Sequence, residues 1–459
     1  MSKLQVGFSK VNITPALGSG IYGYYIDRNA RGILDELFIR TLAISLGERK
    51  ILMFSADLCE LPTPVVERFA AAIEKATGVP ANDIMITATH THTGPFLEVG
   101  NLGGRPEEIE PYVNFVESRI VDGARLALAD LKDSKMGYIV GYAPERVAYI
   151  RRYKMKDGTT FTCPPINDPN IVGPIGELDQ RVNVLRFERE GGKSIALVNY
   201  GVHADTVNGE LLSADFPCYM YETLERALGI ECLFFPGAQG DVGSTHVFPE
   251  KGDMNDTEIS FDNEMKSPGM ARFVGHALAG TVLQVYDKAY FVDVDRIDVI
   301  RRDLFVPANL PTPEDMPLAR KYKELHESGR DDLIPFKAMQ LTTVVAEALR
   351  MCEMEGGPAE IRLPLTALRL GPVAFVGIPG EPFTEIGVKI KEAEGFDMIL
   401  PCALTNGAEG YFPMESAYAE GGYEARTSHF KAGVADAIVK AAKDLIAELP
   451  DKSKFEKTF

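Results

Sequence analysis

The chain has 459 residues, 45% of them hydrophobic, and a formal net charge of −18 at pH 7. That charge argues against a nucleic-acid partner, because binding a phosphate backbone requires clustered lysine and arginine. No apolar run approaches the roughly 18 residues that a membrane-spanning helix needs, and the first residues lack the apolar core of a signal peptide. Six scattered cysteines without a C-x-x-C pair predict reduced thiols. These features predict a cytoplasmic protein whose partner is a small-molecule substrate, and they leave the oligomeric state open.

Strand and helix patterns alternate along the first half of the chain. In chain order, the predicted elements are a buried strand at 50–56, a helix from the cap Thr63 to Gly78, a strand ending at His90, a helix at 107–131, and, after a loop-rich stretch, a strand ending at His203.

The second half continues in the same way, with no repeat or long linker. Its predicted elements are a helix at 217–228, a strand at 231–235, a helix from Ser267-Pro268 to 286, strand-like sequence at 290–306, helices at 312–329 and 336–355, a hairpin at 360–370 and 373–378 with a Gly371-Pro372 turn, a helix after Glu381, a strand at 398–403 and a helix at 431–449. The acid-rich segment 250–265 is predicted to be a surface excursion near the functional site. We therefore expect an α/β fold of layered mixed sheets flanked by helices, in one domain spanning residues 1–459.

Three polar residues follow apolar runs that end in loops. His90 comes after Ile84-Met85-Ile86, His203 after a run at 195–198, and Glu381 after a run at 373–376. Strand ends are where open α/β sheets collect binding groups. Two imidazoles and a carboxylate with an exchangeable water are typical of a catalytic zinc centre. The pattern predicts that these three residues bind one zinc ion.

Each of these residues also has a purely structural interpretation. His90 and His92 would share one face if the strand continued through them, and both could be satisfied hydrogen-bonding histidines. His203 could form an ion pair with Asp205, and Glu381 could stabilise the start of a helix. The positions at three strand ends favour metal binding over these alternatives.

A glycine-rich stretch around Asp241 is a second candidate for chemistry, in the sequence Gln239-Gly240-Asp241-Val242-Gly243-Ser244. Such a loop lets backbone N–H groups approach a ligand or an oxyanion. Its structural alternative is a tight turn in which Asp241 holds its own backbone. Ser244 and Thr245 could supply a hydroxyl nucleophile, although the sequence places no evident base beside them. Asp215 is expected to cap the helix that follows it.

With these segments in view, the chain resembles the catalytic domain of the neutral ceramidases, which are non-lysosomal zinc amidases. The resemblance lies in residues 6–15 (VGFSKVNITP), 30–33 (ARGI) and above all 89–95 (THTHTGP). It implies that the zinc ligands are His90, His203, Glu381 and Tyr418, with Tyr411 and Tyr423 as nearby competitors for the tyrosine. It also implies that His92 faces the substrate and that Arg151 or Arg152 contacts it.

The sequence departs from the family pattern at two points. Gly237 in Phe235-Pro236-Gly237-Ala238-Gln239 stands at the expected position of the catalytic serine, and Phe430 at that of a tyrosine that holds the substrate carbonyl. The family's secretion signal and C-terminal immunoglobulin-like domain are not expected here.

The resulting hypothesis is a zinc-dependent hydrolase of the amide bond in a small soluble N-acyl substrate, with metal-activated water as nucleophile. His92, Arg151 or Arg152, and Asp241 would act on the substrate. The alternatives are a zinc esterase or lactonase, and a zinc-containing binding protein that has lost activity.

Overall fold

The larger of two main sheets has nine strands and forms the centre of the fold. The computed structural model describes residues 3–98, 105–249 and 266–449, so the predicted excursion at 250–265 lies outside the described residues. In spatial order the strands are β14 (Glu231–Pro236), β12 (Ile195–Tyr200), β11 (Arg181–Arg189), β6 (Lys132–Tyr142), β1 (Leu4–Asn12), β3 (Phe38–Leu46), β4 (Arg49–Ala56) and β5 (Ile84–Ala88), with β16 (Tyr290–Val292) added on β6. The pairs β12–β14 and β4–β5 are parallel and the others antiparallel, so the sheet is mixed.

A second sheet of four strands lies against one face of the first. Its strands are β17 (Ile297–Pro307), β18 (Glu360–Leu370), β19 (Val373–Gly377) and β21 (Met398–Cys402). Shorter pairings join β10 (Ile171–Pro174), β8 (Arg152–Met155) and β9 (Thr160–Thr162), and also β13 (Leu211–Leu212) with β2 (Gly32–Ile33), β15 (Val242–Gly243) with β7 (Tyr149–Ile150), and β20 (Glu381–Pro382) with β22 (Tyr411–Phe412).

Ten helices are assigned within the described residues. They are α1 (Thr63–Thr77), α2 (Pro106–Ala129), α3 (Phe216–Leu228), α4 (Pro268–Val285), α5 (Met316–Glu327), α6 (Ala338–Met354), α7 (Thr384–Lys391), α8 (Glu415–Glu420), α9 (Tyr423–Thr427) and α10 (Val434–Glu448). None of them is long and apolar enough to cross a membrane.

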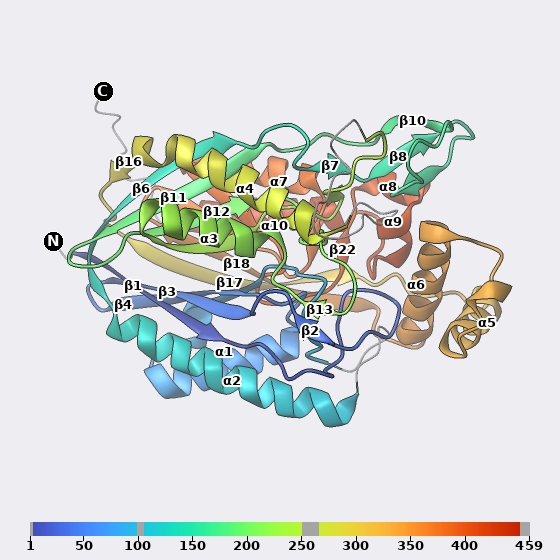
Figure 1. The fold of residues 1–459 in the computed structure, drawn as a ribbon, viewed down its shortest axis with the longest axis horizontal. Helices are drawn as coiled ribbons and strands as arrows, with labels where there is room; N and C mark the ends of the chain where they lie inside the picture. The colour runs from blue at the N-terminus through green and yellow to red at the C-terminus, as the bar shows by residue number, and fades with distance from the viewer. Residues whose placement is uncertain (1–2, 99–104, 250–265, 450–459) are drawn as a thin grey trace.

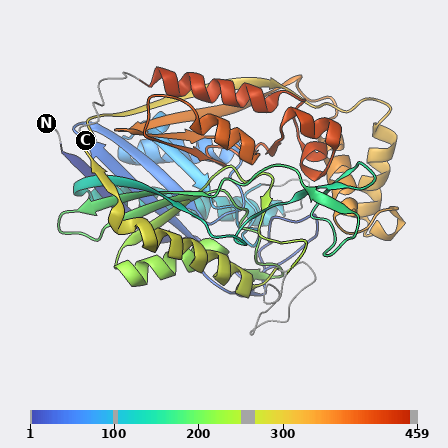
Figure 2. The same cartoon turned by 90° about the horizontal axis from the view of Figure 1, so that it is seen from above.

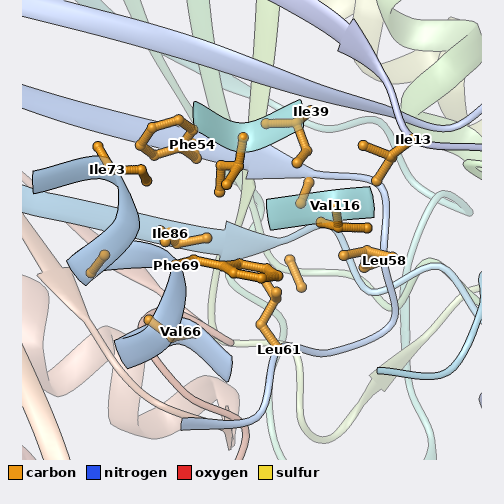
Figure 3. Close-up of a cluster of buried hydrophobic side chains, with 14 of the residues drawn as sticks. Ile13, Ile39, Phe54, Leu58, Leu61, Val66, Phe69, Ile73, Ile86 and Val116 are labelled. Atoms are coloured by element: carbon orange, nitrogen blue, oxygen red, sulfur yellow. The ribbon is translucent and has the colours of Figure 1, made fainter. Parts of the chain in front are cut away.

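The buried side chains define four layers. Helices α1 and α2 cover one face of β3–β5, where Phe54 and Ile86 of the strands pack with Phe69, Ile73 and Val116 of the helices (Figure 3). On the other half of the same face, α3 and α4 cover β11, β12 and β14.

The opposite face of the nine-stranded sheet packs on the four-stranded sheet. Leu197 and Leu233 of the large sheet meet Phe375 and Leu400 of the small one, and α7 and α10 close the far side. Figure 1 shows the sheets between their helices, and Figure 2 shows α10 and α3–α4 on opposite sides of the molecule. This arrangement confirms the α/β fold of mixed sheets flanked by helices.

Helix ends show how closely local sequence controls this fold. Ser267 caps α4 as predicted, because its hydroxyl accepts a hydrogen bond from Met270 N at 3.1 Å. Asp215 caps α3 by accepting from Phe216 N. Thr63, by contrast, is the first helical residue of α1 and not its cap, since its hydroxyl donates to Glu409 at 2.6 Å. That prediction was wrong because a distant carboxylate competes for the hydroxyl.

The stretch predicted to be rich in loops contains two of the longest strands, β6 and β11. Gly137 and Gly141 weaken the strand signal of β6, and both are required by close packing. A Cβ at Gly141 would lie 2.7 Å from Thr281 Cγ2 of α4, and one at Gly137 would lie 3.2 Å from Tyr290 O of β16. The two glycines that weaken the strand pattern in the sequence therefore allow α4 and β16 to pack closely against β6.

The loops that carry the predicted zinc ligands meet at one end of the two sheets. Ala88 N at the end of β5 donates to Leu404 O at 3.1 Å, and Ala403 N after β21 donates to Pro236 O of β14 at 3.0 Å. Because β12 is paired in parallel with β14 and β19 with β21, the strands that precede His90, His203 and Glu381 end at the same place.

Candidate metal centre

His90, His203 and Glu381 come together in the buried region where these strands end. Glu381 Oε2 lies 3.1 Å from His90 Nε2 and 2.9 Å from His203 Nε2. The three side chains are at most 7% exposed, and their potential ligand atoms form a group that could hold a metal ion. Residues separated by up to 291 positions in the chain are thus brought to one point, as the sequence predicted for these three.

Hydrogen bonds at the far side of each ring set the two imidazoles for metal binding. His90 Nδ1 donates to Cys59 O at 2.8 Å, and His203 Nδ1 donates to Gln239 O at 2.8 Å and Val242 O at 2.9 Å. A proton on Nδ1 leaves the Nε2 lone pair directed at Glu381. Backbone carbonyl oxygens of this kind orient metal-ligating histidines in known centres.

This donor set fits a divalent metal ion. With both imidazoles protonated on Nδ1, the buried Glu381 Oε2 receives no hydrogen bond from any described residue and faces two nitrogen lone pairs. Acceptors that converge in a buried site need a cation between them to be stable, whether that cation is a proton or a metal ion. The nitrogen and carboxylate donors are those that zinc prefers.

The charges around the cluster support the same conclusion. Burial lowers the pKa of His203 to about 4, with a further contribution from the Arg151 guanidinium, so His203 is neutral at pH 7. Burial opposes ionisation of Glu381, but His90 and His203 outweigh it and hold its pKa well below the usual range. The carboxylate in turn outweighs burial at His90 and raises the pKa of that imidazole, so a proton on His90 Nε2 would compete with a metal ion for this point. Glu381 is therefore an anion that attracts positive charge to this point.

His92 lies beside the cluster, although not for the reason that the sequence suggested. β5 ends at Ala88, and His90 has a φ of +74°, which an extended strand does not allow. The loop nevertheless places His92 Nε2 3.3 Å from His90 Nε2, while His92 Nδ1 donates to Gly23 O at 3.0 Å. Burial lowers the pKa of His92 to about 3, so its Nε2 is an acceptor facing the metal donors.

Tyr411, and not Tyr418, contacts the cluster. Tyr411 Oη lies 3.4 Å from His203 Nε2, and its ring is stacked on that of His203 with 16° between the planes. Tyr418 lies on α8, where its hydroxyl pairs with Ser428 Oγ at 3.1 Å and its ring packs against the core beneath α10. Tyr411 stood among the nearby tyrosines in the sequence, and only the short β20–β22 pairing, Glu381 with Tyr411, singles it out.

The two tyrosines give a matched pair of variants. We expect Tyr411→Phe to weaken zinc binding by about tenfold, the lower end for groups that support a metal site. Tyr418→Phe should change zinc affinity less than about twofold and cost about 1 kcal/mol of stability from the lost Ser428 hydrogen bond. Zinc titration against a chromogenic chelator measures the first effect and urea unfolding the second. Weaker zinc binding by Tyr418→Phe than by Tyr411→Phe would contradict this placement.

The structure separates the two candidate arginines. Arg151 lies over the ring of Tyr411 at 5.4 Å, donates to Gly240 O at 2.8 Å and pairs with the buried Glu424 at 2.7 Å. Arg152 points to Glu420 and Gly421 O, and lies over Phe383. Only Arg151 therefore approaches the cluster, through Tyr411.

Asp241 is buried and holds the start of α7. Its Oδ1 accepts hydrogen bonds from Thr384 N at 2.7 Å and Thr384 Oγ1 at 2.8 Å. A carboxylate at a helix N-terminus satisfies a backbone donor that the helix leaves unpaired. The Asp241 carboxylate therefore binds the first residue of α7 and supports the loop after Glu381. Ser244 is buried in the next part of the same loop.

Gly237, expected at the position of the family's serine, does not face the metal donors. A Cβ there would lie 3.0 Å from Gly201 N and 3.1 Å from Tyr200 C. The direction of that Cβ is into the backbone after β12, so a serine at 237 would not reach the cluster without displacing it.

A serine at 237 should therefore harm the fold without adding a nucleophile. We expect Gly237→Ser to lower the free energy of unfolding by about 1–3 kcal/mol, the usual cost of overpacking. Gly173→Ser is the control, because nothing lies within 4 Å of a Cβ at that position. Urea unfolding of both variants measures the difference, and a Gly237→Ser variant as stable as wild type would contradict the steric argument.

One group of polar residues at the site is not evident from the sequence. Asp205 pairs with Lys266 at 2.8 Å, accepts a hydrogen bond from Tyr24 and lies 3.7 Å from His92 Nδ1. The predicted alternative, a pair between Asp205 and His203, does not form, since His203 is directed at Glu381. The nearby Tyr25 Oη lies 3.3 Å from Tyr423 Oη. The tyrosine-rich sequence at 22–25 was the available signal, but nothing local tied it to the metal donors.

Comparisons with known proteins identify relatives of the chain. No protein-family model matches it. Neutral ceramidase of Pseudomonas aeruginosa is 24% identical over an alignment 481 positions long, which covers 91% of this chain and 68% of the relative. The crystal structure of neutral ceramidase from Pseudomonas aeruginosa superposes with a TM-score of 0.71 at 19% identity, covering 99% of this chain and 77% of the other. A ceramidase complexed with C2 gives a TM-score of 0.74 at 19% identity, with 99% and 78% covered. The chain is thus a homologue of neutral ceramidase with the same fold, which confirms the family resemblance seen in its sequence.

Proposed function

We propose that this chain is a zinc-dependent hydrolase that cleaves the amide bond of a small soluble N-acyl substrate. The observation that carries the proposal is the convergence of His90 Nε2, His203 Nε2 and Glu381 Oε2 at one buried point, where Glu381 Oε2 has no hydrogen-bond partner among the described residues. The relationship to neutral ceramidase supports hydrolysis of a carbon–nitrogen bond.

The residues of the centre fall into two groups, those that would bind the metal ion and those that would assist them. His90, His203 and Glu381 would hold the metal, and Tyr411 is the tyrosine placed to assist them. Zinc bound there would supply a Lewis acid for the substrate carbonyl and would lower the pKa of a water molecule toward about 7.

His92 would bind and orient the attacking water. Its Nδ1 is fixed on Gly23 O, so its Nε2 lone pair points toward the metal donors and can accept a hydrogen bond from water. In amide hydrolysis the water oxygen bonds to the carbonyl carbon, the C–N bond breaks, and the nitrogen leaves with a proton from the water. While the proton passes from the water to the leaving nitrogen, the His92 imidazole would carry a transient positive charge. The Asp205 carboxylate, 3.7 Å from His92 Nδ1, favours that charge.

Arg151 contributes through Tyr411. Its guanidinium is held by Glu424 and by Gly240 O, with its face toward the Tyr411 ring. A fixed cation beside the phenol favours negative charge on the Tyr411 oxygen or on a substrate oxygen next to it. Arg152 is committed to Glu420 and Gly421 and has no such role.

The polar surroundings favour a small soluble substrate over a long lipid. Tyr24, Asp205 and Lys266 form a hydrogen-bonded group beside His92, and the hydroxyls of Tyr25 and Tyr423 pair nearby. Hydroxyl and charged groups of this kind bind polar acyl or amine parts, and leaving them against an alkyl chain would cost desolvation energy.

A substrate panel tests the proposal. Zinc-loaded protein would be assayed with short N-acyl amides, the matching esters, lactones and ceramide, beside chelator-treated protein. We expect zinc-dependent turnover of the amides and little or none of ceramide. Preference for esters or lactones would support the alternative hydrolase, and zinc binding without any turnover would favour a binding protein.

Rapid-quench kinetics with intact-protein mass spectrometry tests water as the nucleophile. Direct attack by water predicts no burst of the first product and no acylated protein, and near-wild-type turnover in Ser244→Ala. An acyl adduct on Ser244 together with loss of activity in Ser244→Ala would show that a serine attacks instead.

A further inference from the structure

The loop at residues 22–25 lies against the metal centre on the side of the donor atoms. The Nδ1 atoms of both ligand histidines are bound by backbone carbonyl oxygens, so protein closes the opposite side of the cluster. On the donor side, His92 Nε2 lies 3.3 Å from His90 Nε2, and His92 Nδ1 donates to Gly23 O at 3.0 Å. A Cβ at Gly23 would lie 2.9 Å from His92 Cα, so the loop backbone packs directly on the residue that faces the donors.

Three tyrosines anchor this loop, and each binds a different segment of the site. The hydroxyl pairs are Tyr22 with Glu60, Tyr24 with Asp205, and Tyr25 with Tyr423. These partners belong to the segments that follow β4, β12 and β22. One short loop thus joins elements that are distant in the chain, beside the metal donors.

Tyr25 forms the wall of this loop on the side of Tyr411. Its hydroxyl lies 3.3 Å from Tyr423 Oη, and the Tyr423 ring meets the Tyr411 ring edge-on with 5.6 Å between the centroids. The Tyr25 ring packs against an apolar cluster that includes Val345 and Leu349 of α6. Both ends of the side chain are therefore held, and the ring between them is a rigid obstacle.

The acyl group of a substrate would lie on this side of the centre. His92 and Asp205 act on the proton that goes to the leaving nitrogen, so the nitrogen faces them and the acyl chain extends the other way, toward Tyr411. Tyr25 is within electrostatic reach of the donors there. Burial raises the pKa of Tyr25 to about 12, and the Glu381 carboxylate contributes to the shift.

We propose that Tyr25 determines the length of the acyl group, so that the substrates are amides of short carboxylic acids such as acetic acid. This inference rests on the proposed amide hydrolysis. A longer acyl chain would have to displace the Tyr25 ring, which would break the hydroxyl pair with Tyr423 and the packing on α6. An acetyl group ends before it meets the ring.

Isothermal titration calorimetry with hydroxamates tests the length limit without catalysis. Acetohydroxamate and octanohydroxamate bind zinc through the same two oxygen atoms and differ only in the alkyl chain. On the zinc-loaded full chain, we expect octanohydroxamate to bind at least about tenfold more weakly than acetohydroxamate. Tyr25→Ala should raise octanohydroxamate affinity by about tenfold, the gain from burying two CH₂ groups, and change acetohydroxamate affinity less than about twofold.

Three further variants separate the wall from other effects. Tyr25→Phe keeps the ring and should keep the length limit, and Tyr25→Leu decides the question if Tyr25→Ala does not fold. Tyr322→Ala is the matched control, because Tyr322 lies on α5 and packs on the same apolar cluster as Tyr25. Equal affinity of the two hydroxamates in the wild type, or an equal gain in Tyr322→Ala, would overturn the proposal.

Kinetics with N-acetyl and N-octanoyl amides of one amine then connect the wall to the reaction. We expect the kcat/KM ratio of octanoyl to acetyl substrate to rise about tenfold in Tyr25→Ala. Turnover of short amides with an unchanged ratio would refute the role of Tyr25 alone. A length limit in hydroxamate binding without turnover of any amide would refute hydrolysis and leave the wall in place.

Discussion

Replacing His203 with alanine is expected to abolish metal binding and hydrolysis together. The wild type should carry about one zinc ion per chain, held by two imidazoles and a carboxylate. His203→Ala leaves two of the three protein donors, and the buried Glu381 carboxylate keeps only one of its two imidazole partners. Zinc content should fall below about a tenth of the wild-type value, and turnover of the best amide substrate by at least about a thousandfold, since the metal supplies several kcal/mol of transition-state stabilisation.

Metal analysis after dialysis and a steady-state assay measure the two effects. His276→Ala is the matched control, because His276 is an exposed histidine on α4, far in sequence from every donor. It should keep full zinc content and activity. Wild-type zinc content in His203→Ala would refute the metal centre, whereas retained zinc with lost activity would place His203 in catalysis alone.

The second large effect concerns Arg151 and the stability of the site. Glu424 is completely buried, with Arg151 Nε 2.7 Å from its Oε1 and Thr162 Oγ1 2.7 Å from its Oε2. Arg152 Nε is 3.9 Å away and cannot replace the lost hydrogen bond. Removing Arg151 leaves the buried Glu424 carboxylate only the ion pair with Arg152 at 3.9 Å and the Thr162 hydrogen bond, so Arg151→Met should lower the free energy of unfolding by about 3 kcal/mol, the lower end for breaking a buried ion pair.

Urea unfolding in the presence of a chelator measures this cost without a contribution from bound metal. Arg426→Met is the control, since Arg426 is 40% exposed in its pair with Glu347 and should lose less than about 1 kcal/mol. The double variant Arg151→Met, Glu424→Gln should regain part of the loss, because the buried charge is gone. A loss below 1 kcal/mol in Arg151→Met would show that Glu424 does not depend on it.

The sequence was sufficient for most of the secondary structure and for three side chains that converge at the candidate metal centre. Apolar runs that end in His90, His203 and Glu381 mark strand ends, and strand ends gather at one edge of a layered α/β fold. The hairpin at 360–378 and the cap at Ser267 also follow from local chemistry, since the Gly371 turn and the serine hydroxyl act within a few residues. For the hairpin and the cap, the deciding interactions are close in sequence.

Tertiary structure alone decided the residues whose roles depend on distant partners. Tyr411 and Tyr418 look alike in sequence, and the pairing of β20 with β22 brings only Tyr411 to His203. Arg151 and Arg152 are adjacent in the chain, yet Arg151 lies against Gly240 O and the Tyr411 ring whereas Arg152 donates to Glu420 and Gly421 O. Gly237 occupies the position of a missing nucleophile in the sequence, but a Cβ at this position would point into the backbone of Gly201 and away from the cluster. A linear pattern fixes which chemical groups are available, whereas the packing of segments far apart in the chain fixes which of them meet.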